Sequence, residues 1–458
     1  MASPGLTDLA GADGSESNSS LFPPGGEGDS ATPKYDQPLL KPDSSPTAAL
    51  ASAAVPISSE ELDRKYAPYV RRDAYGTMGR EKLPLTEKIL LGIAAVTLVP
   101  IRVVAGVLIL VFYYLICRIC TLFSPPSREN GQEDYAHMTG WRREVIVRCG
   151  RFASRAMLFA FGFYWIKESR RGLGNEVNEF ERPGAIVSNH ISYVDILYHM
   201  SSAFPSFVAK RSVASLPLVG LISKCLGCVY VQRESKSSDL KGVSGIVTER
   251  IQKSHKDYLC PMMLLFPEGT TTNGDFLLPF KSGAFLAKAP VVPVILRYPY
   301  HRFSPAWDSI SGVRHVCLLL CQFVNHLEVI HLPVYYPSEQ EKEDPKLYAN
   351  NVRKLMATEG NLMLSDVGLA EKRIYLAILN EIFFLKKNKG RRKKCRNGAA
   401  IKTYIEQPVN QATSLARRRM QFGLSIFKFF CPYILCRSDG LDYILRYYGI
   451  FKMCMIFL

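Results

Sequence analysis

The chain has 458 residues, of which 47% are hydrophobic, and its 57 lysines and arginines against 41 aspartates and glutamates give a formal charge of +16. This length and apolar content allow about two to three domains with sizeable cores, which excludes a small disulfide-stapled protein. The positive charge favours anionic partners such as phospholipid head groups, nucleotide phosphates or nucleic acid. Eight of the positive charges lie within residues 386–396, so the net charge says little about the rest of the chain.

The N-terminal residues 1–60 are rich in Ser, Gly, Pro, Ala and Asp, and they predict a disordered tail. No apolar segment lies close to Met1, so a cleavable signal peptide is not predicted. Residues 61–88 carry several arginines and lysines ahead of a long apolar run. We interpret them as a basic juxtamembrane linker.

The apolar run covers residues 89–123 and is interrupted by Pro100 and Arg102. It is too long for one straight span of about 20 residues and too short for two. Either residues 103–123 cross the bilayer alone, or the break produces a re-entrant hairpin. Positive residues flank both sides, which favours the hairpin. The length and apolarity of the run disfavour a buried helix of a soluble protein.

Residues 141–167 mix arginines with large apolar side chains, the pattern of an amphipathic helix. Such a helix either lies in the lipid head-group layer or packs on the neighbouring domain.

Residues 183–337 contain short apolar runs separated by helix-length spacers, a pattern typical of α/β domains whose sheet is covered on both faces. Helical patterns at 344–359 and 370–385 follow, so we predict an α/β domain over 183–385. The predicted strands are 185–188, 207–209, 229–231, 262–266, 291–296 and 329–335.

The twelve cysteines are spread along the chain, and they predict reduced thiols on the cytosolic side. Two Cys-x-x-Cys pairs, Cys117/Cys120 and Cys225/Cys228, stand about 100 residues apart, and the first lies in the apolar run. Structural zinc needs closer ligand pairs in polar surroundings, so we predict no metal site.

A histidine and an aspartate follow the first predicted strand. His190 and Asp195 are five residues apart, which is about 500° around an ideal helix, so both cannot lie on one helical face. We therefore predict that His190 lies on the turn and that Asp195, in the first helical turn, reaches back to it. This arrangement leaves one imidazole nitrogen to act as a general base. Taken alone, the pair is more typical of a structural cap.

Three further motifs follow in order: Gly227-Cys-Val-Tyr-Val-Gln-Arg233, Phe266-Pro-Glu-Gly-Thr270 and Val291-Val-Pro-Val294. Together with Asn189-His190-x4-Asp195, they match the four motif blocks of the glycerolipid acyltransferases in order and spacing. The chain therefore resembles this family over residues 183–300. The residues that support the motifs, besides those with expected roles, are Asn189, Gly227, Phe266, Pro267 and Pro293.

The resemblance implies a mixed sheet covered by helices, an N-terminal membrane-embedded helical segment, and acyl transfer from acyl-CoA to a lysophospholipid. His190 would take the proton of the acceptor hydroxyl as its oxygen attacks the thioester carbonyl. Asp195 would orient His190 and stabilise the imidazolium. No serine or cysteine nucleophile is required when both substrates are held together, and no cofactor is expected because acyl-CoA is a co-substrate.

Further residues are expected to bind substrates. Arg233 would pair with an acceptor phosphate, although a surface arginine at a strand end is the structural alternative. Glu268 would accept a hydrogen bond from the acceptor or fix Arg233. Gly269, followed by Thr270, would let backbone N–H groups approach a phosphate or oxyanion. Lys281 would contact a CoA or lipid phosphate, or remain solvated.

The residues after Thr270 bear on the head group. Thr271-Thr272 stands where family members that act on lysophosphatidic acid commonly carry Arg-Ser. Absence of that arginine fits a phosphodiester acceptor, and the segment is similar to plant lysophosphatidylethanolamine acyltransferases and related lysophosphatidylcholine enzymes. We favour lysophosphatidylethanolamine over lysophosphatidylcholine, with lysophosphatidic acid or glycerol 3-phosphate as alternatives. A lipid-binding protein without turnover is disfavoured because it would not need His190 and Asp195.

The C-terminal extension, residues 386–458, is first basic and then hydrophobic, and it carries no motif. Contact with anionic lipid is favoured over nucleic-acid binding, because no nucleic-acid module accompanies the basic run. No EF-hand loop is present in the sequence, so calcium control is not predicted. The resemblance implies the endoplasmic reticulum membrane as the location and phospholipid remodelling as the process.

Overall fold

The computed structural model describes residues 59–389, except 80, 82, 130–131, 172–181, 232–242 and 308–311, and it describes side chains up to residue 379. Almost all of the predicted disordered tail and of the C-terminal extension lies outside the described residues. Arg233 lies outside them as well.

A seven-stranded sheet forms the centre of the domain, in the order β5-β12-β11-β6-β9-β7-β8. Strands β11 and β12 are antiparallel, and the other neighbouring strands are parallel. This confirms the predicted α/β class and the mixed sheet. The strands are β5 Ile166–Arg170, β6 Ala185–Ser188, β7 Ser206–Lys210, β8 Val229–Val231, β9 Met263–Leu265, β11 Val291–Arg297 and β12 Leu327–His331.

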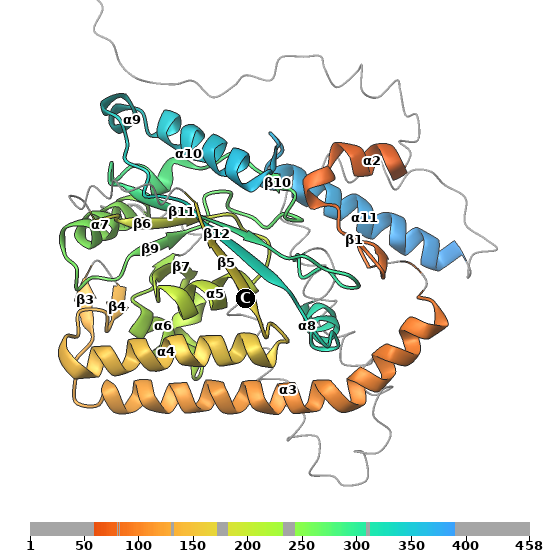
Figure 1. Cartoon of the computed structure of the whole chain (residues 1–458), viewed down its shortest axis with the longest axis horizontal. Helices are drawn as coiled ribbons and strands as arrows, with labels where there is room; N and C mark the ends of the chain where they lie inside the picture. Colours follow the sequence, from red (N-terminus) through yellow and green to blue (C-terminus); the bar gives the residue numbers. More distant parts are fainter. Residues whose placement is uncertain are drawn as a thin grey trace, which may run out of the picture. The chain divides into compact units, whose positions relative to one another are not determined.

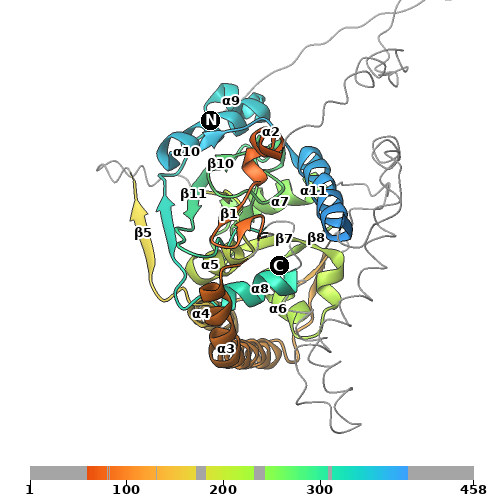
Figure 2. The same ribbon diagram turned by 90° about the vertical axis from the view of Figure 1, so that its right-hand side faces the viewer.

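Helices cover both faces of this sheet (Figures 1 and 2). Side chains alternate along each strand, so Ile186 faces one hydrophobic core while Ala185 and Val187 face the other. The first core joins the sheet to α3, α4, α5, α6 and α8, and the second joins it to α7 and α10. The helices are α3 Leu85–Cys120, α4 Gly140–Ala160, α5 Val194–Ser202, α6 Val219–Leu226, α7 Val243–Lys256, α8 Gly312–Leu320 and α10 Pro345–Gly360.

Residues 59–79 are folded, which corrects the prediction of a linker over 61–88. They form helix α2 (Ser59–Lys65) and a small hairpin of β1 (Arg72–Asp73) and β2 (Gly76–Thr77). Their buried aromatic residues explain the difference, because Tyr66 stacks on Tyr375 of helix α11 at 5.2 Å between ring centroids. Helix α11 spans Leu369–Lys389 and shares a third, smaller hydrophobic core with this segment.

The apolar run forms one continuous helix, α3, which passes through Pro100 and bends in its first half (Figure 1). The chain does not reverse within the run, so the hairpin prediction is wrong. Helix α3 is long and apolar enough to cross a membrane, and only 6% of its most apolar window is buried. Arg102 nevertheless ties it to the domain, donating hydrogen bonds to the carbonyls of Leu320, Gln322 and Phe323.

Helix α4 packs along α3 and is shorter than the predicted helix over 141–167. It ends at Ala160, two residues before Gly162, whose φ of +90° favours glycine and is incompatible with a helix. The chain then enters β5 at Ile166, so the sheet begins before residue 183. Large apolar side chains on α4, including Phe152 and Phe159, remain exposed.

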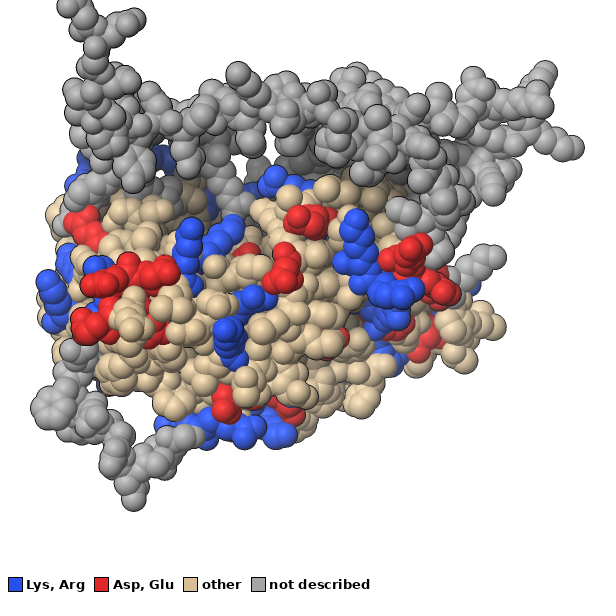
Figure 3. Space-filling model, turned by 90° about the horizontal axis from the view of Figure 1, so that it is seen from above, with Lys and Arg blue, Asp and Glu red and all other residues tan. Residues whose placement is uncertain are grey.

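The remaining elements are short. They comprise β3 Ser127–Glu129, β4 Gln132–Asp134, β10 Phe276–Leu277, β13 Met363–Leu364, α9 Glu339–Glu343 and the 3-10 helices Ala67–Tyr69, Arg211–Ser215 and Ser282–Ala284. On the face shown in Figure 3, acidic and basic side chains of the described residues are interspersed rather than gathered by sign. The net charge therefore does not mark a binding surface on the visible part of this face.

Candidate active site

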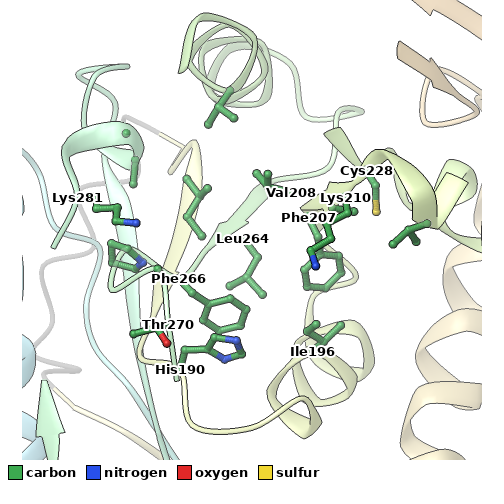
Figure 4. Close-up of a pocket in the computed structure, with 18 of the residues that line it drawn as sticks. His190, Ile196, Phe207, Val208, Lys210, Cys228, Leu264, Phe266, Thr270 and Lys281 are labelled. Carbon is green, nitrogen blue, oxygen red and sulfur yellow. The ribbon is translucent and has the colours of Figure 1, made fainter. Parts of the chain in front are cut away.

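The predicted motif residues meet at one edge of the sheet. Strands β6, β7, β9 and β11 run parallel, so the loops that follow them emerge at the same edge. A cavity of about 760 Å³ opens there, lined by His190, Phe266, Thr270, Lys210 and Lys281 (Figure 4). Its size is within the range of ligand pockets.

His190 lies on the loop between β6 and α5, and Asp195 lies in the first turn of α5. The Nδ1 atom of His190 is 2.8 Å from Oδ2 of Asp195. A carboxylate acceptor at Nδ1 fixes the tautomer in which Nδ1 carries the proton, so Nε2 is the nitrogen that can accept one. The His190 side chain is 21% exposed and lines the cavity, whereas that of Asp195 is fully buried.

Hydrogen bonds hold both oxygens of the Asp195 carboxyl group. Its Oδ2 atom accepts the backbone N–H groups of Ile191 at 2.7 Å and Ser192 at 3.0 Å, in addition to His190. Its Oδ1 atom accepts the hydroxyl of Tyr298 at 2.6 Å. Charge-assisted bonds of this kind stabilise an ionised carboxylate away from water. Asp195 is therefore suited to stabilise a positive charge on His190.

The His190 loop is fixed from two sides. The side-chain amide of Asn189 donates to the carbonyl of Leu296 at 3.0 Å and accepts its N–H at 2.8 Å, which prolongs the pairing of β6 with β11. The ring of Phe266 stacks on the imidazole with centroids 4.1 Å apart (Figure 4). These contacts restrict rotation of the ring, which a positioned base requires.

Glu268 contributes to this loop rather than to the cavity surface. It is only 3% exposed, and its two carboxyl oxygens accept the backbone N–H groups of His190 at 2.9 Å and Leu278 at 3.0 Å. This corrects the expectation that Glu268 meets the acceptor. Burial raises the pKa of Glu268 to about 8, against the lowering effect of the two backbone hydrogen bonds.

The raised pKa of Glu268 predicts a pH dependence of stability. Its pKa in the folded protein, about 8, exceeds the ordinary value of 4.5. The contribution of protonated Glu268 to the free energy of unfolding is therefore complete below pH 4.5 and is lost as pH rises through 8. We expect Glu268→Gln to lower the melting temperature at pH 5, because both oxygens of the neutral carboxylic acid keep lone pairs for the two N–H groups whereas the amide nitrogen cannot accept one. The variant should also show a smaller fall in melting temperature between pH 5 and pH 8. Melting curves in detergent measure both effects.

The control variant is Glu328→Gln, which removes the same charge from a carboxylate whose side chain is 34% exposed. It should keep the decline of the wild-type protein. A Glu268→Gln variant with the wild-type decline would show that this carboxyl group does not titrate between the two pH values.

The loop after Glu268 places Gly269 and Thr270 beside the cavity. The Gly269 N–H donates to the Phe266 carbonyl at 3.0 Å and closes a tight turn, and Gly269 itself has a positive φ of +70°, which favours glycine. The N–H of Gly269 itself is thus already used, and the expectation that the neighbouring backbone N–H groups approach a phosphate or oxyanion stays a prediction. The Lys281 side chain packs directly over Gly269, and a side chain at that position would collide with it.

Lys210 is a cavity residue that sequence reasoning missed. It ends β7 and faces Lys281 across the cavity, with the apolar side chain of Leu264 between them and those of Phe207 and Ile196 on the side of Lys210 (Figure 4). Its place directly after a predicted parallel strand was the available signal, because such residues gather at the carboxyl edge. The cavity thus combines an apolar interior with two cationic side chains.

The other motif residues act in the framework. Gly227 ends α6 in the left-handed conformation with φ of +75°, close to Ala136 and Ser206. The carbonyl of Pro267 accepts the N–H of Lys281, and that of Pro293 accepts the N–H of Leu332. Within the described residues, no group of three His, Cys, Asp or Glu side chains is arranged to hold a metal ion.

Comparison with known proteins identifies relatives of the chain. A family model described as Acyltransferase matches residues 170–297. The chain is 62% identical over 376 residues to the lysophospholipid acyltransferase LPEAT1 of Arabidopsis thaliana, covering 76% of this chain and 92% of the relative. It is 37% identical to a lysophosphatidylcholine acyltransferase of Drosophila melanogaster, covering 60% of this chain, and 32% identical to the human lysophosphatidylcholine acyltransferase 2, covering 65%.

The chain spans about half the length of these two, 49% and 51% respectively. Among solved structures, the 1-acyl-sn-glycerophosphate (LPA) acyltransferase PlsC from Thermotoga maritima aligns with 58% of this chain and 100% of its own. The identity is 17% and the TM-score is 0.35.

Proposed function

The chain belongs to the acyltransferase family, and we propose that it transfers an acyl group from acyl-CoA to the free hydroxyl of a lysophospholipid, with His190 as the general base. The observation that carries this proposal is the His190–Asp195 pair at the wall of the cavity, with Nδ1 held at 2.8 Å from the carboxylate. The high identity to a lysophospholipid acyltransferase over nearly its whole length supports the substrate class.

The reaction needs one proton transfer in each direction. Nε2 of His190 accepts the hydroxyl proton while the acceptor oxygen forms a bond to the thioester carbonyl carbon. The carbon–sulfur bond then breaks, and the imidazolium returns the proton to the leaving CoA thiolate. Asp195 stabilises the imidazolium between the two steps. Direct transfer forms no acyl-enzyme, so labelled acyl-CoA without acceptor should leave the protein unlabelled.

Lys210 and Lys281 are proposed to bind substrate phosphates from opposite walls. We expect Lys210→Ala to raise the KM of a phosphate-bearing substrate by about tenfold, the effect of one charge-assisted contact, with a much smaller change in kcat. Varying acyl-CoA and lysophospholipid separately shows which substrate uses the contact. Lys253→Ala, which removes an exposed lysine of α7 away from the cavity, is the control. Unchanged KM values for both substrates would contradict this role of Lys210.

For the head group, we propose lysophosphatidylethanolamine. Thr271 supports a phosphodiester acceptor. It is 9% exposed, and its carbonyl and hydroxyl oxygens accept hydrogen bonds from the Lys372 ammonium at 2.6 Å and 2.8 Å. Thr271 itself is uncharged, and the Lys372 ammonium beside it is bound by Thr271 and belongs to a residue that is only 7% exposed, so this position offers less positive charge to a phosphomonoester than an arginine would. Initial rates with lysophosphatidylethanolamine, lysophosphatidylcholine, lysophosphatidic acid and glycerol 3-phosphate test the proposal. A higher kcat/KM with either phosphomonoester than with both phosphodiesters would overturn it.

Membrane attachment is proposed through α3 and α4. The face of α3 that points away from the domain exposes Ile101, Leu108 and Phe112, and α4 exposes Phe152 and Phe159. Arg102 and the packing of α4 along α3 hold α3 against the domain. We therefore propose that the two helices lie against or within the bilayer. The proposed location is the endoplasmic reticulum membrane. Fractionation with organelle markers tests the location.

A further inference from the structure

We propose that Tyr298 is a positioning residue for the His190–Asp195 pair, and that its hydroxyl keeps the Asp195 carboxyl group aimed at the imidazole. This inference rests on the proposed function of His190. Tyr298 lies one residue after β11, outside the motif blocks that indicated the family. Its hydroxyl is 2.6 Å from Oδ1 of Asp195, the carboxylate oxygen that does not contact His190.

Tyr298 is held firmly enough to fulfil this role. Tyr298 is 8% exposed, and its ring packs edge to face against that of Phe163, with 5.8 Å between the ring centroids. Phe163 lies three residues after the end of α4. The backbone of β11 is paired with both β6 and β12, so the strand before Tyr298 is fixed in the middle of the sheet. Burial of the phenol, together with the neighbouring carboxylate, raises the pKa of Tyr298 well above its ordinary value. The hydroxyl therefore remains a donor.

The two oxygens of Asp195 have different surroundings. Three N–H groups donate to Oδ2, whereas the Tyr298 hydroxyl donates to Oδ1. Removing the hydroxyl leaves part of a buried negative charge without its donor. The pair then binds a proton more tightly, whether that proton resides on the carboxylate or on the imidazole. A base that is protonated at higher pH loses activity at the acidic end of its pH profile.

Other titratable or charged groups surround the pair. His199 of α5 is neutral, because burial lowers its pKa to about 3, while the pKa of Glu268 is about 8. These groups are the same in the wild type and in a variant that lacks only the Tyr298 hydroxyl. A difference between the pH profiles of their activities is therefore caused by the missing hydroxyl. The groups from the neighbouring elements are Tyr193, His199, Glu268, His331, Lys372, Lys210 and Lys281.

The test is Tyr298→Phe, which keeps the ring and its packing. We expect kcat to fall by about tenfold, as for one hydrogen bond to a charged acceptor, with KM for the lysophospholipid nearly unchanged. We also expect the acidic limb of kcat/KM to move to higher pH. The matched control is Tyr348→Phe in α10, which removes a buried hydroxyl that donates to the Ala289 carbonyl at 3.0 Å, away from the pair. Its pH profile should match the wild type.

A second measurement does not depend on turnover. Diethyl pyrocarbonate modifies neutral imidazoles, so the pH midpoint of His190 modification, followed by peptide mass spectrometry, reports protonation of the pair. We expect a higher midpoint in Tyr298→Phe than in the wild type and in Tyr348→Phe. An unchanged or lower midpoint would overturn the inference, even if the wild-type protein had no acyltransferase activity. Absence of wild-type activity on every acceptor would instead overturn the proposed function.

Discussion

His190→Ala is expected to lower kcat/KM for lysophospholipid acylation by about 100- to 10,000-fold, the usual contribution of a general base. The alanine removes Nε2, which is the only atom that the proposal assigns to proton transfer. The fold should persist, because the Asn189 amide and the backbone N–H of residue 190 keep their partners on Leu296 and Glu268. Initial rates at saturating and limiting acceptor measure the loss.

The control is His137→Ala, which removes an exposed imidazole outside the cavity and should leave the rate unchanged. Melting curves and binding of acyl-CoA must match the wild type before the loss is attributed to chemistry. A His190→Ala variant that is folded, binds acyl-CoA and turns over at the wild-type rate would remove His190 from the mechanism.

Asp195→Asn is expected to lower kcat by on the order of 100-fold or more, with little change in KM. The asparagine oxygen can replace Oδ2 and accept the three N–H groups of His190, Ile191 and Ser192. Its amide nitrogen can donate to the Tyr298 hydroxyl, which accepts as readily as it donates. The geometry is thereby kept while the negative charge is lost. The variant therefore measures how much the charge stabilises the imidazolium.

Two further variants serve as comparisons for Asp195→Asn. Asp344→Asn, at the N-cap of α10, exchanges one capping residue for another and should have wild-type kinetics. Asp195→Ala leaves several buried donors without an acceptor and should also lower the melting temperature, which Asp195→Asn should not. Wild-type kcat in a folded Asp195→Asn protein would contradict a role for the carboxylate charge.

Local sequence patterns located the central strands well. The predicted runs 185–188 and 229–231 coincide with β6 and β8, because buried parallel strands appear as short, continuous apolar segments. Strand β12 ends at His331 rather than at residue 335, since Pro333 has no N–H for the ladder. Strand β5, with the sequence Ile-Lys-Glu-Ser-Arg, was missed because it lies at the sheet edge with four exposed side chains and has no apolar pattern.

The site was predictable where the residues lie close together in the chain. The turn geometry of His190 and Asp195 follows from helix periodicity over five residues, and the structure has that geometry. The contacts of Glu268 with His190 and Leu278 depend on how three loops meet in space, so sequence alone suggested a substrate contact instead. Tyr298 is 103 residues from Asp195, and nothing local to either residue indicates that they meet.

The most direct test of the account compares wild-type and His190→Ala proteins, at equal amounts in the same membranes, with labelled acyl-CoA in the presence and absence of lysophosphatidylethanolamine. We predict labelled diacyl product only with the wild type and only when acceptor is present. Equal product from both proteins, or none from the wild type above the variant with lysophosphatidylethanolamine or any other acceptor, would contradict acyl transfer through His190.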